Sequence, residues 1–161
     1  MIDVLKQNIS KKQTTELHKV MAYAKRKIIK SYKDNGLKAC GKFGQSLAIQ
    51  IKGNRGELWA IDYVENMEFG TPPQTVVPIN KLVQWIECKK ISKPVQFKTI
   101  NDFAFAIQRS IRKKGTQAYR KGGTYFIEKG ISENEIEKHL DRISNDLMLE
   151  AFNTLGKQIE F

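Results

Sequence analysis

The sequence predicts an α+β domain, in which a small antiparallel sheet built on a β-hairpin packs against a long N-terminal helix and further helices. Apolar residues recur every three or four positions in several segments, which is typical of helices. They alternate on both sides of one glycine-rich turn, which is typical of a hairpin. The chain has 161 residues and 40% hydrophobic content, enough to enclose a core. We therefore predict a single domain over residues 1–161.

A long helix is expected over residues 11–35. Ser10 and Gln13 have the spacing of a capping box at its start, and Asn35-Gly36 supplies a stop. Its apolar face carries Leu17, Val20, Met21, Ala24, Ile28 and Tyr32. The other face carries Lys19, Arg26, Lys30 and Lys33, either as solvated residues or as a stripe that meets phosphates or a partner.

The clearest local pattern is a β-hairpin over residues 46–63. Residues 53–56, Gly-Asn-Arg-Gly, form a predicted four-residue turn between two alternating segments. One face of the hairpin should pack on the long helix, because a lone hairpin is not stable. The alternating apolar positions are Leu47, Ile49 and Ile51 before the turn and Trp59, Ile61 and Tyr63 after it.

The next segment predicts a helix near residues 79–90 and then a short edge strand. Pro78 can open the helix at its first turn. The strand is expected over residues 94–99, where a leading proline suits the edge of a sheet.

Two more helices are expected toward the C-terminus, over residues 101–114 and 132–155. Asn101 or Asp102 caps the first, and Ser132 with Glu135 forms a capping box for the second. The first ends at Gly115 and the second at Gly156. The polar, glycine-rich segment 116–123 between them is predicted to be a mobile loop, after which Phe126 returns to the core.

The net charge of +11 is unevenly distributed along the chain. Residues 1–55 hold 13 Lys and Arg against 3 Asp and Glu, and residues 102–129 hold seven against two. Residues 130–161 hold three against seven, a net of −4. This distribution indicates either a polyanionic partner or association between oppositely charged surfaces of several copies.

The sequence contains little catalytic chemistry. Cys40 and Cys88 are predicted to be isolated thiols of a reduced, intracellular protein, since no other Cys or His lies near them. His18 and His139 are expected on the surface. The N-terminus lacks the pattern of a secretory signal, and no apolar run approaches the ~20 residues of a membrane span. We therefore predict no enzyme, with no catalytic, metal or cofactor site.

Glu65 and Glu68 leave one catalytic alternative open. They are three residues apart, so a helical turn would place them side by side, where they could bind Mg²⁺ in a nuclease. No further acid-rich run with a lysine follows them. We favour an acidic surface that pairs with basic segments of another subunit.

Two short motifs resemble the tail-completion, or neck, proteins of tailed bacteriophages. The run Tyr63 to Thr71 contains Met-Glu-Phe-Gly-Thr, which resembles the family's Y-x-x-x-V-E-F-G-T element, with Met67 in the valine position. Residues 41–47 resemble its G-x-L-x-x-S-I strand start, with Phe43 in the leucine position. The run 103–116, followed by a loop and a Phe, is similar to a segment common in phage tail and neck proteins. The resemblance covers about residues 15–130; the long acidic C-terminal helix and the tryptophan-bearing helix after Pro72-Pro73 depart from it.

This resemblance implies a structural virion protein that forms a ring, hexameric or dodecameric, at the head–tail junction. Its expected partners are copies of itself, connector and tail proteins, and non-specifically the DNA that passes through; no membrane is expected. It would act in the virion, after assembly in the host cytoplasm. The predicted subunit contact is Glu65, Glu68, Phe69, Gly70 and Thr71, and the predicted contact to DNA or an acidic partner is Arg112, Lys113, Lys114, Arg120 and Lys121.

A small basic nucleic-acid-binding protein is the alternative function. The sequence pI near 9.7 and the basic segment 116–123 favour it. The sequence lacks the patterns of a zinc finger, an RNA-recognition sheet or a clear helix-turn-helix.

Overall fold

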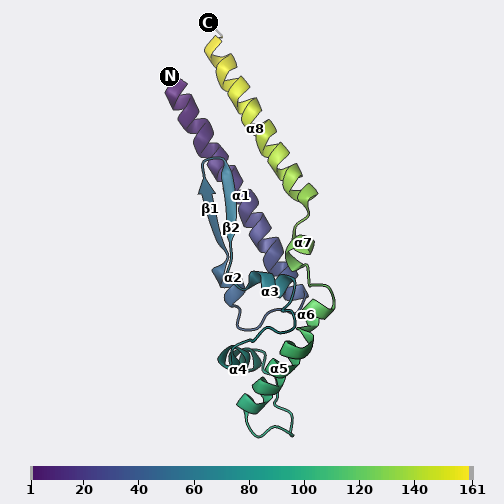
Figure 1. Ribbon diagram of the computed structural model, residues 1–161. Helices are drawn as coiled ribbons and strands as arrows, with labels where there is room; N and C mark the ends of the chain where they lie inside the picture. The colour runs from purple at the N-terminus through teal and green to yellow at the C-terminus, as the bar shows by residue number, and fades with distance from the viewer. Residues whose placement is uncertain (1, 160–161) are drawn as a thin grey trace. The chain divides into compact units, whose positions relative to one another are not determined.

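The computed structural model describes residues 2–159, with side chains described for residues 10–153. Within this range the fold is mostly helical, with one two-stranded antiparallel sheet (Figure 1). The predicted class, α+β with a hairpin against a long N-terminal helix, is confirmed. The elements are α1 (Ile2–Asp34), α2 (Lys42–Ser46), β1 (Ala48–Lys52), β2 (Arg55–Trp59), α3 (Val64–Glu68), α4 (Ile79–Cys88), α5 (Ile100–Lys114), α6 (Gln117–Arg120), α7 (Phe126–Gly130) and α8 (Glu133–Ile159).

The contacts of the chain divide it into two compact units. Unit 1 comprises residues 1–30, 47–59 and 128–161, and unit 2 comprises residues 31–46 and 60–127. Two of the four boundaries fall inside α1 and α7, and the other two follow α2 and β2. The prediction of a single domain stays a prediction, and each unit is described by itself below.

In unit 1, the hairpin packs against α1 (Figure 1). Strands β1 and β2 pair in a register that places Ala48 opposite Trp59. A Cβ at Gly56 would lie 2.8 Å from Cγ of Met21, so the glycine allows β2 to approach the helix closely. Leu17, Val20, Ala24 and Ile28 of the predicted apolar face are buried.

Two predicted boundaries in unit 1 are wrong. Helix α1 begins at Ile2, so Ser10 lies inside the helix instead of capping it. The hairpin is shorter than the predicted 46–63, and Arg55 and Gly56 belong to β2, so the turn has fewer residues than the predicted four. Tyr63 is not in a strand, because the chain turns into α3 directly after it.

Helix α8 contacts α1 within unit 1 through polar side chains. The carboxylate of Glu135 accepts a hydrogen bond from the Tyr23 hydroxyl at 3.3 Å and forms an ion pair with Lys27 at 3.1 Å. The ring of His139 lies 4.7 Å from that of Tyr23, and Glu150 pairs with Lys12. None of the described side chains of α8 is fully buried. The predicted capping contact is present, since the Glu135 N–H donates to Ser132 Oγ.

Unit 2 has an aromatic core. Phe43 and Phe126 are fully buried, with ring centroids 5.3 Å apart in an edge-to-face arrangement. Tyr32, at the end of α1, lies 4.7 Å from Phe43, and burial raises the pKa of its phenol. The predicted return of Phe126 to the core is confirmed.

A second cluster in unit 2 joins α4 to α5. Leu82, Ile86 and Ala104 are buried at its centre. Helix α5 begins one residue before the predicted 101, because Thr99 is the N-cap and forms a capping box with Asp102. This contact lowers the pKa of Asp102. The predicted edge strand at 94–99 is wrong, since these residues form turns and bends before α5.

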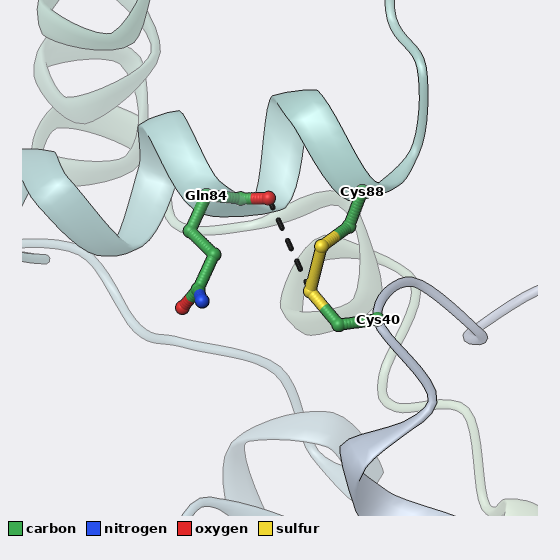
Figure 2. The surroundings of a disulfide bond; sticks show 3 residues. All are labelled: Cys40, Gln84 and Cys88. Atoms are coloured by element: carbon green, nitrogen blue, oxygen red, sulfur yellow. Dashed lines mark hydrogen bonds between the residues drawn. A yellow bond between two sulfur atoms is a disulfide. The ribbon is translucent and has the colours of Figure 1, made fainter.

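A disulfide corrects the prediction of isolated thiols. Cys40 and Cys88, 48 residues apart in the sequence, have Cα atoms 5.0 Å apart and are joined (Figure 2). The bond attaches the segment after α1 to the last residue of α4. Lys89, which follows α4, also donates to the carbonyl of Gly36. The separation of 48 residues gave no indication that the two cysteines lie close together. The chain leaves Cys40, forms the hairpin and α3, and only then returns to it.

Candidate functional site

The motif that resembles the neck-protein element lies at a junction inside unit 2. We call it the motif junction: residues 67–71 together with residues 115–127. Backbone contacts join its two segments, since the Thr124 N–H donates to the Glu68 carbonyl at 2.6 Å. The Thr124 hydroxyl also donates to the carbonyl of Met67 at 2.9 Å. Residues 56 and 57 positions apart in the sequence are therefore held in one place.

Glu68 is the buried anchor of the motif junction. Its side chain is 5% exposed, and its two carboxylate oxygens accept the Ile127 N–H at 3.3 and 3.2 Å. This corrects the expectation that Glu68 lies on a contact surface beside Glu65. The α3 turn separates the two carboxylates: Glu65 is exposed, whereas Glu68 satisfies a backbone donor in the interior.

Thr71 and Thr116 form a reciprocal pair at the other end of the motif junction. The Thr71 N–H donates to the Thr116 hydroxyl at 2.9 Å, and the Thr116 N–H donates to the Thr71 carbonyl at 2.9 Å. The same hydroxyl accepts the Tyr119 N–H and so caps α6. Part of the predicted mobile loop is therefore a short helix with a fixed start.

Gly70 is required where the two segments meet. It is buried and has a φ of 79°, and a Cβ there would lie 2.1 Å from the backbone nitrogen of Tyr119. No side chain fits at that distance. Gly70 thus serves close backbone approach within the unit, although we predicted it in a subunit contact.

Exposed rings and cations surround this rigid centre. We call Phe69, Tyr119, Arg120, Lys121 and Tyr125 the aromatic–basic patch. The rings are 54%, 44% and 39% exposed for Phe69, Tyr119 and Tyr125, and both cations are exposed. Phe69 and Tyr125 contact edge to face, 6.1 Å apart. Tyr125 has a φ of 52°, a left-handed conformation that is costly for an aromatic residue and is found more often at functional sites.

The structure thus brings together most of the two predicted sets of contact residues. Phe69, Gly70 and Thr71 lie against the segment that carries Arg120 and Lys121. Arg112, Lys113 and Lys114 are exposed in the last turn of α5, and the Gln74 N–H donates to the Arg112 carbonyl. Their roles in binding stay predictions.

Sequence reasoning missed four residues of the motif junction: Thr116, Tyr119, Thr124 and Tyr125. Thr116 had a readable signal, because a threonine before a short polar segment is a preferred N-cap. The Gly122-Gly123 pair was also a readable signal, because glycine allows two backbone segments to approach closely. In the structure, a Cβ at Gly123 would lie 3.0 Å from the carbonyl oxygen of Glu68. Nothing local indicated that Glu68 would be its partner.

Among the residues that the structure describes, no group of three or more His, Cys, Asp or Glu side chains is placed to hold a metal ion. None of the described helices has the length and apolar character needed to cross a bilayer. No protein-family model, curated protein or solved structure matches this chain.

Proposed function

We propose that this chain is a structural virion protein of a tailed bacteriophage, which forms a ring at the head–tail junction. The ring would join the portal or connector to the tail and let DNA pass. The observation that supports the proposal is the motif junction. The Met-Glu-Phe-Gly-Thr residues on which the resemblance rests are those that fix segment 115–127 and its exposed rings and cations.

A ring subunit needs a fixed surface more than it needs a reaction centre. The hydrogen bonds of Glu68, Thr71 and Thr116 hold the backbone beneath the aromatic–basic patch, so less backbone has to be ordered on association. Exposed Arg112, Lys113 and Lys114 suit non-specific contact with phosphates or with an acidic neighbouring protein.

The proposal is tested by assembly on a connector. The purified chain is mixed with the portal and connector proteins encoded in the same genome, and the products are imaged by electron microscopy. We expect closed rings of the chain seated on the connector. Absence of the chain from every connector particle, at concentrations where the chain is folded, would contradict the proposal.

A nucleic-acid-binding protein is the second candidate, favoured by exposed rings beside Arg120 and Lys121, since bases stack on aromatic side chains. It predicts binding of single-stranded DNA that weakens steeply between about 50 and 200 mM salt. Fluorescence anisotropy with labelled oligonucleotides measures this. Binding of the connector without measurable DNA affinity would favour the ring protein.

A further inference from the structure

Helix α8 has two faces with different chemistry. The inner face contacts α1 through Glu135, His139 and Glu150. A second set of residues lies two positions from these along the helix, at Glu137, Asp141, Met148 and Phe152. Two positions correspond to about 200° of rotation, so this second set lies on the opposite side. We call it the outer face of α8.

The outer face combines acids with large apolar side chains. Glu137 and Asp141 are exposed, and Met148 and Phe152 are 54% and 66% exposed. Steps of four, seven and four residues keep all four on one stripe of the helix. Exposed apolar side chains rimmed by charges are typical of a protein–protein contact.

The aromatic–basic patch has the complementary chemistry. It carries three exposed rings, two exposed cations and a rigid backbone beneath them. Acids of the outer face match Arg120 and Lys121 in charge, and Met148 and Phe152 match the rings. Thioether and aromatic side chains pack well on aromatic rings.

We infer, resting on the ring proposed above, that the aromatic–basic patch of one copy binds the outer face of α8 of a second copy. Both surfaces belong to the same chain and differ from each other, so the contact is head-to-tail. A head-to-tail contact generates a ring when its rotation closes. Opposite charges would guide the encounter and select the register, and the rings would supply most of the affinity.

Charge reversal tests the pairing directly. One variant carries Arg120→Glu and Lys121→Glu, a second carries Glu137→Lys and Asp141→Lys, and a third carries all four changes. Self-association of the full chain is measured by native mass spectrometry and sedimentation, alone and on the connector. Each double variant should associate at least about tenfold more weakly than the wild type, because like charges then face each other. The fourfold variant, in which opposite charges face again, should recover association.

The matched control is Lys38→Glu with Lys81→Glu, an equal charge change at two exposed lysines of unit 2 outside the patch. It should leave self-association unchanged. Thermal unfolding of every variant checks that the fold is retained, and Phe152→Ala gives a second, uncharged test that should also weaken association.

Five outcomes would overturn the inference, the last of them together with the proposed function. The first is wild-type association in either double variant, and the second is a fourfold variant no better than the doubles. The third is loss of oligonucleotide binding, with association intact, when Arg120 and Lys121 are reversed; this would assign the patch to nucleic acid. Rings that form on the connector in all variants would overturn the α8 contact but leave the proposed function standing. A wild-type chain that never self-associates, alone or on the connector, would overturn both.

Discussion

The interactions that stabilise unit 2 differ from those that stabilise unit 1. In unit 2, buried rings pack edge to face, a disulfide joins Cys40 to Cys88, and backbone hydrogen bonds fix the motif junction. In unit 1, the hairpin packs against α1, and α8 contacts α1 through the side chains of Glu135, His139 and Glu150. Unit 2 therefore encloses a buried aromatic core of its own, whereas none of the described side chains of α8 is buried.

This difference separates a supporting surface from a surface that needs a partner. Ion pairs between exposed side chains contribute little to stability, because water and salt screen them. A long helix held in this way is typical of a segment that gains its full packing on association.

Gly70→Ala should be the most damaging single change. The added Cβ meets the Tyr119 backbone at 2.1 Å, and the φ of 79° is unfavourable for alanine. Neither of the two segments that meet at Gly70 can move away without breaking the hydrogen bonds between Thr71 and Thr116. We expect a loss of about 4 kcal/mol or more in the free energy of unfolding, measured by urea denaturation.

The matched control for this change is Gly122→Ala. Gly122 has a similar φ of 85° but nothing within 4 Å of an added Cβ, so only the backbone cost of about 1–2 kcal/mol applies. Equal losses in the two variants would show that the close approach at Gly70 is not required.

Phe126→Ala should have the next largest effect. Its side chain is fully buried against Phe43 and Tyr32. Truncation to alanine leaves a cavity, which should lower the free energy of unfolding by about 3 kcal/mol or somewhat more. Phe152→Ala is the same substitution on the outer face of α8, where the ring is 66% exposed. It should change the stability of the isolated chain by less than about 0.5 kcal/mol. Similar losses at both positions would remove the contrast between the two units.

Removing the disulfide should have a smaller effect than the loss of Phe126. A Cys40→Ser, Cys88→Ser variant should lose about 2 kcal/mol or more, because the unfolded chain regains the entropy of a 48-residue loop. Differential scanning calorimetry with and without reductant measures it. Reductant should lower the melting temperature of the wild type and leave the serine variant unchanged. A wild type purified with two free thiols and equal stability would restore the original prediction for these cysteines.

Local patterns predicted the hairpin and the longer helices, but not the short helices or the long-range partners of the elements. The periodicity of α1 marked its buried face, because side-chain spacing on a helix depends only on nearby residues. Element ends were less accurate: Thr99, not Asn101 or Asp102, caps α5, although Thr99 and Asp102 have capping-box spacing in the sequence.

The candidate site was only partly readable for the same reason. The motif marked Glu68, Phe69, Gly70 and Thr71 as important, but their roles depend on Thr116, Tyr119 and Ile127. Those residues are 45 to 59 positions away from the groups they contact. Nothing in the local sequence indicates that Glu68 is buried while Glu65, three residues earlier, is exposed. The disulfide was missed on the same grounds.

The smallest predicted effect concerns pH and the contact between α8 and α1. The hydrogen bond from Lys27, and to a smaller extent that from Tyr23, lowers the pKa of Glu135 below its ordinary value of 4.5. A lowered folded-state pKa contributes stability above about pH 4.5 and loses it as pH falls through the folded value. The hydrogen bond with Tyr23, and after it the pairing with Glu135, raises the pKa of Lys27 above its ordinary value of 10.5. The contribution of Lys27 to stability is therefore present below about pH 10.5 and lost as pH rises through the folded value.

We therefore expect amide hydrogen exchange in the first turns of α8 to accelerate, relative to its intrinsic rate, below about pH 4.5. The effect should shrink in high salt, since the pair is accessible to water. Glu135→Gln should reduce this pH dependence, while Glu137→Gln, the same change on the outer face, should retain it. If both variants behaved alike, Glu135 would not be the group that links α8 to α1, and the two faces of the helix would not differ as the contacts indicate.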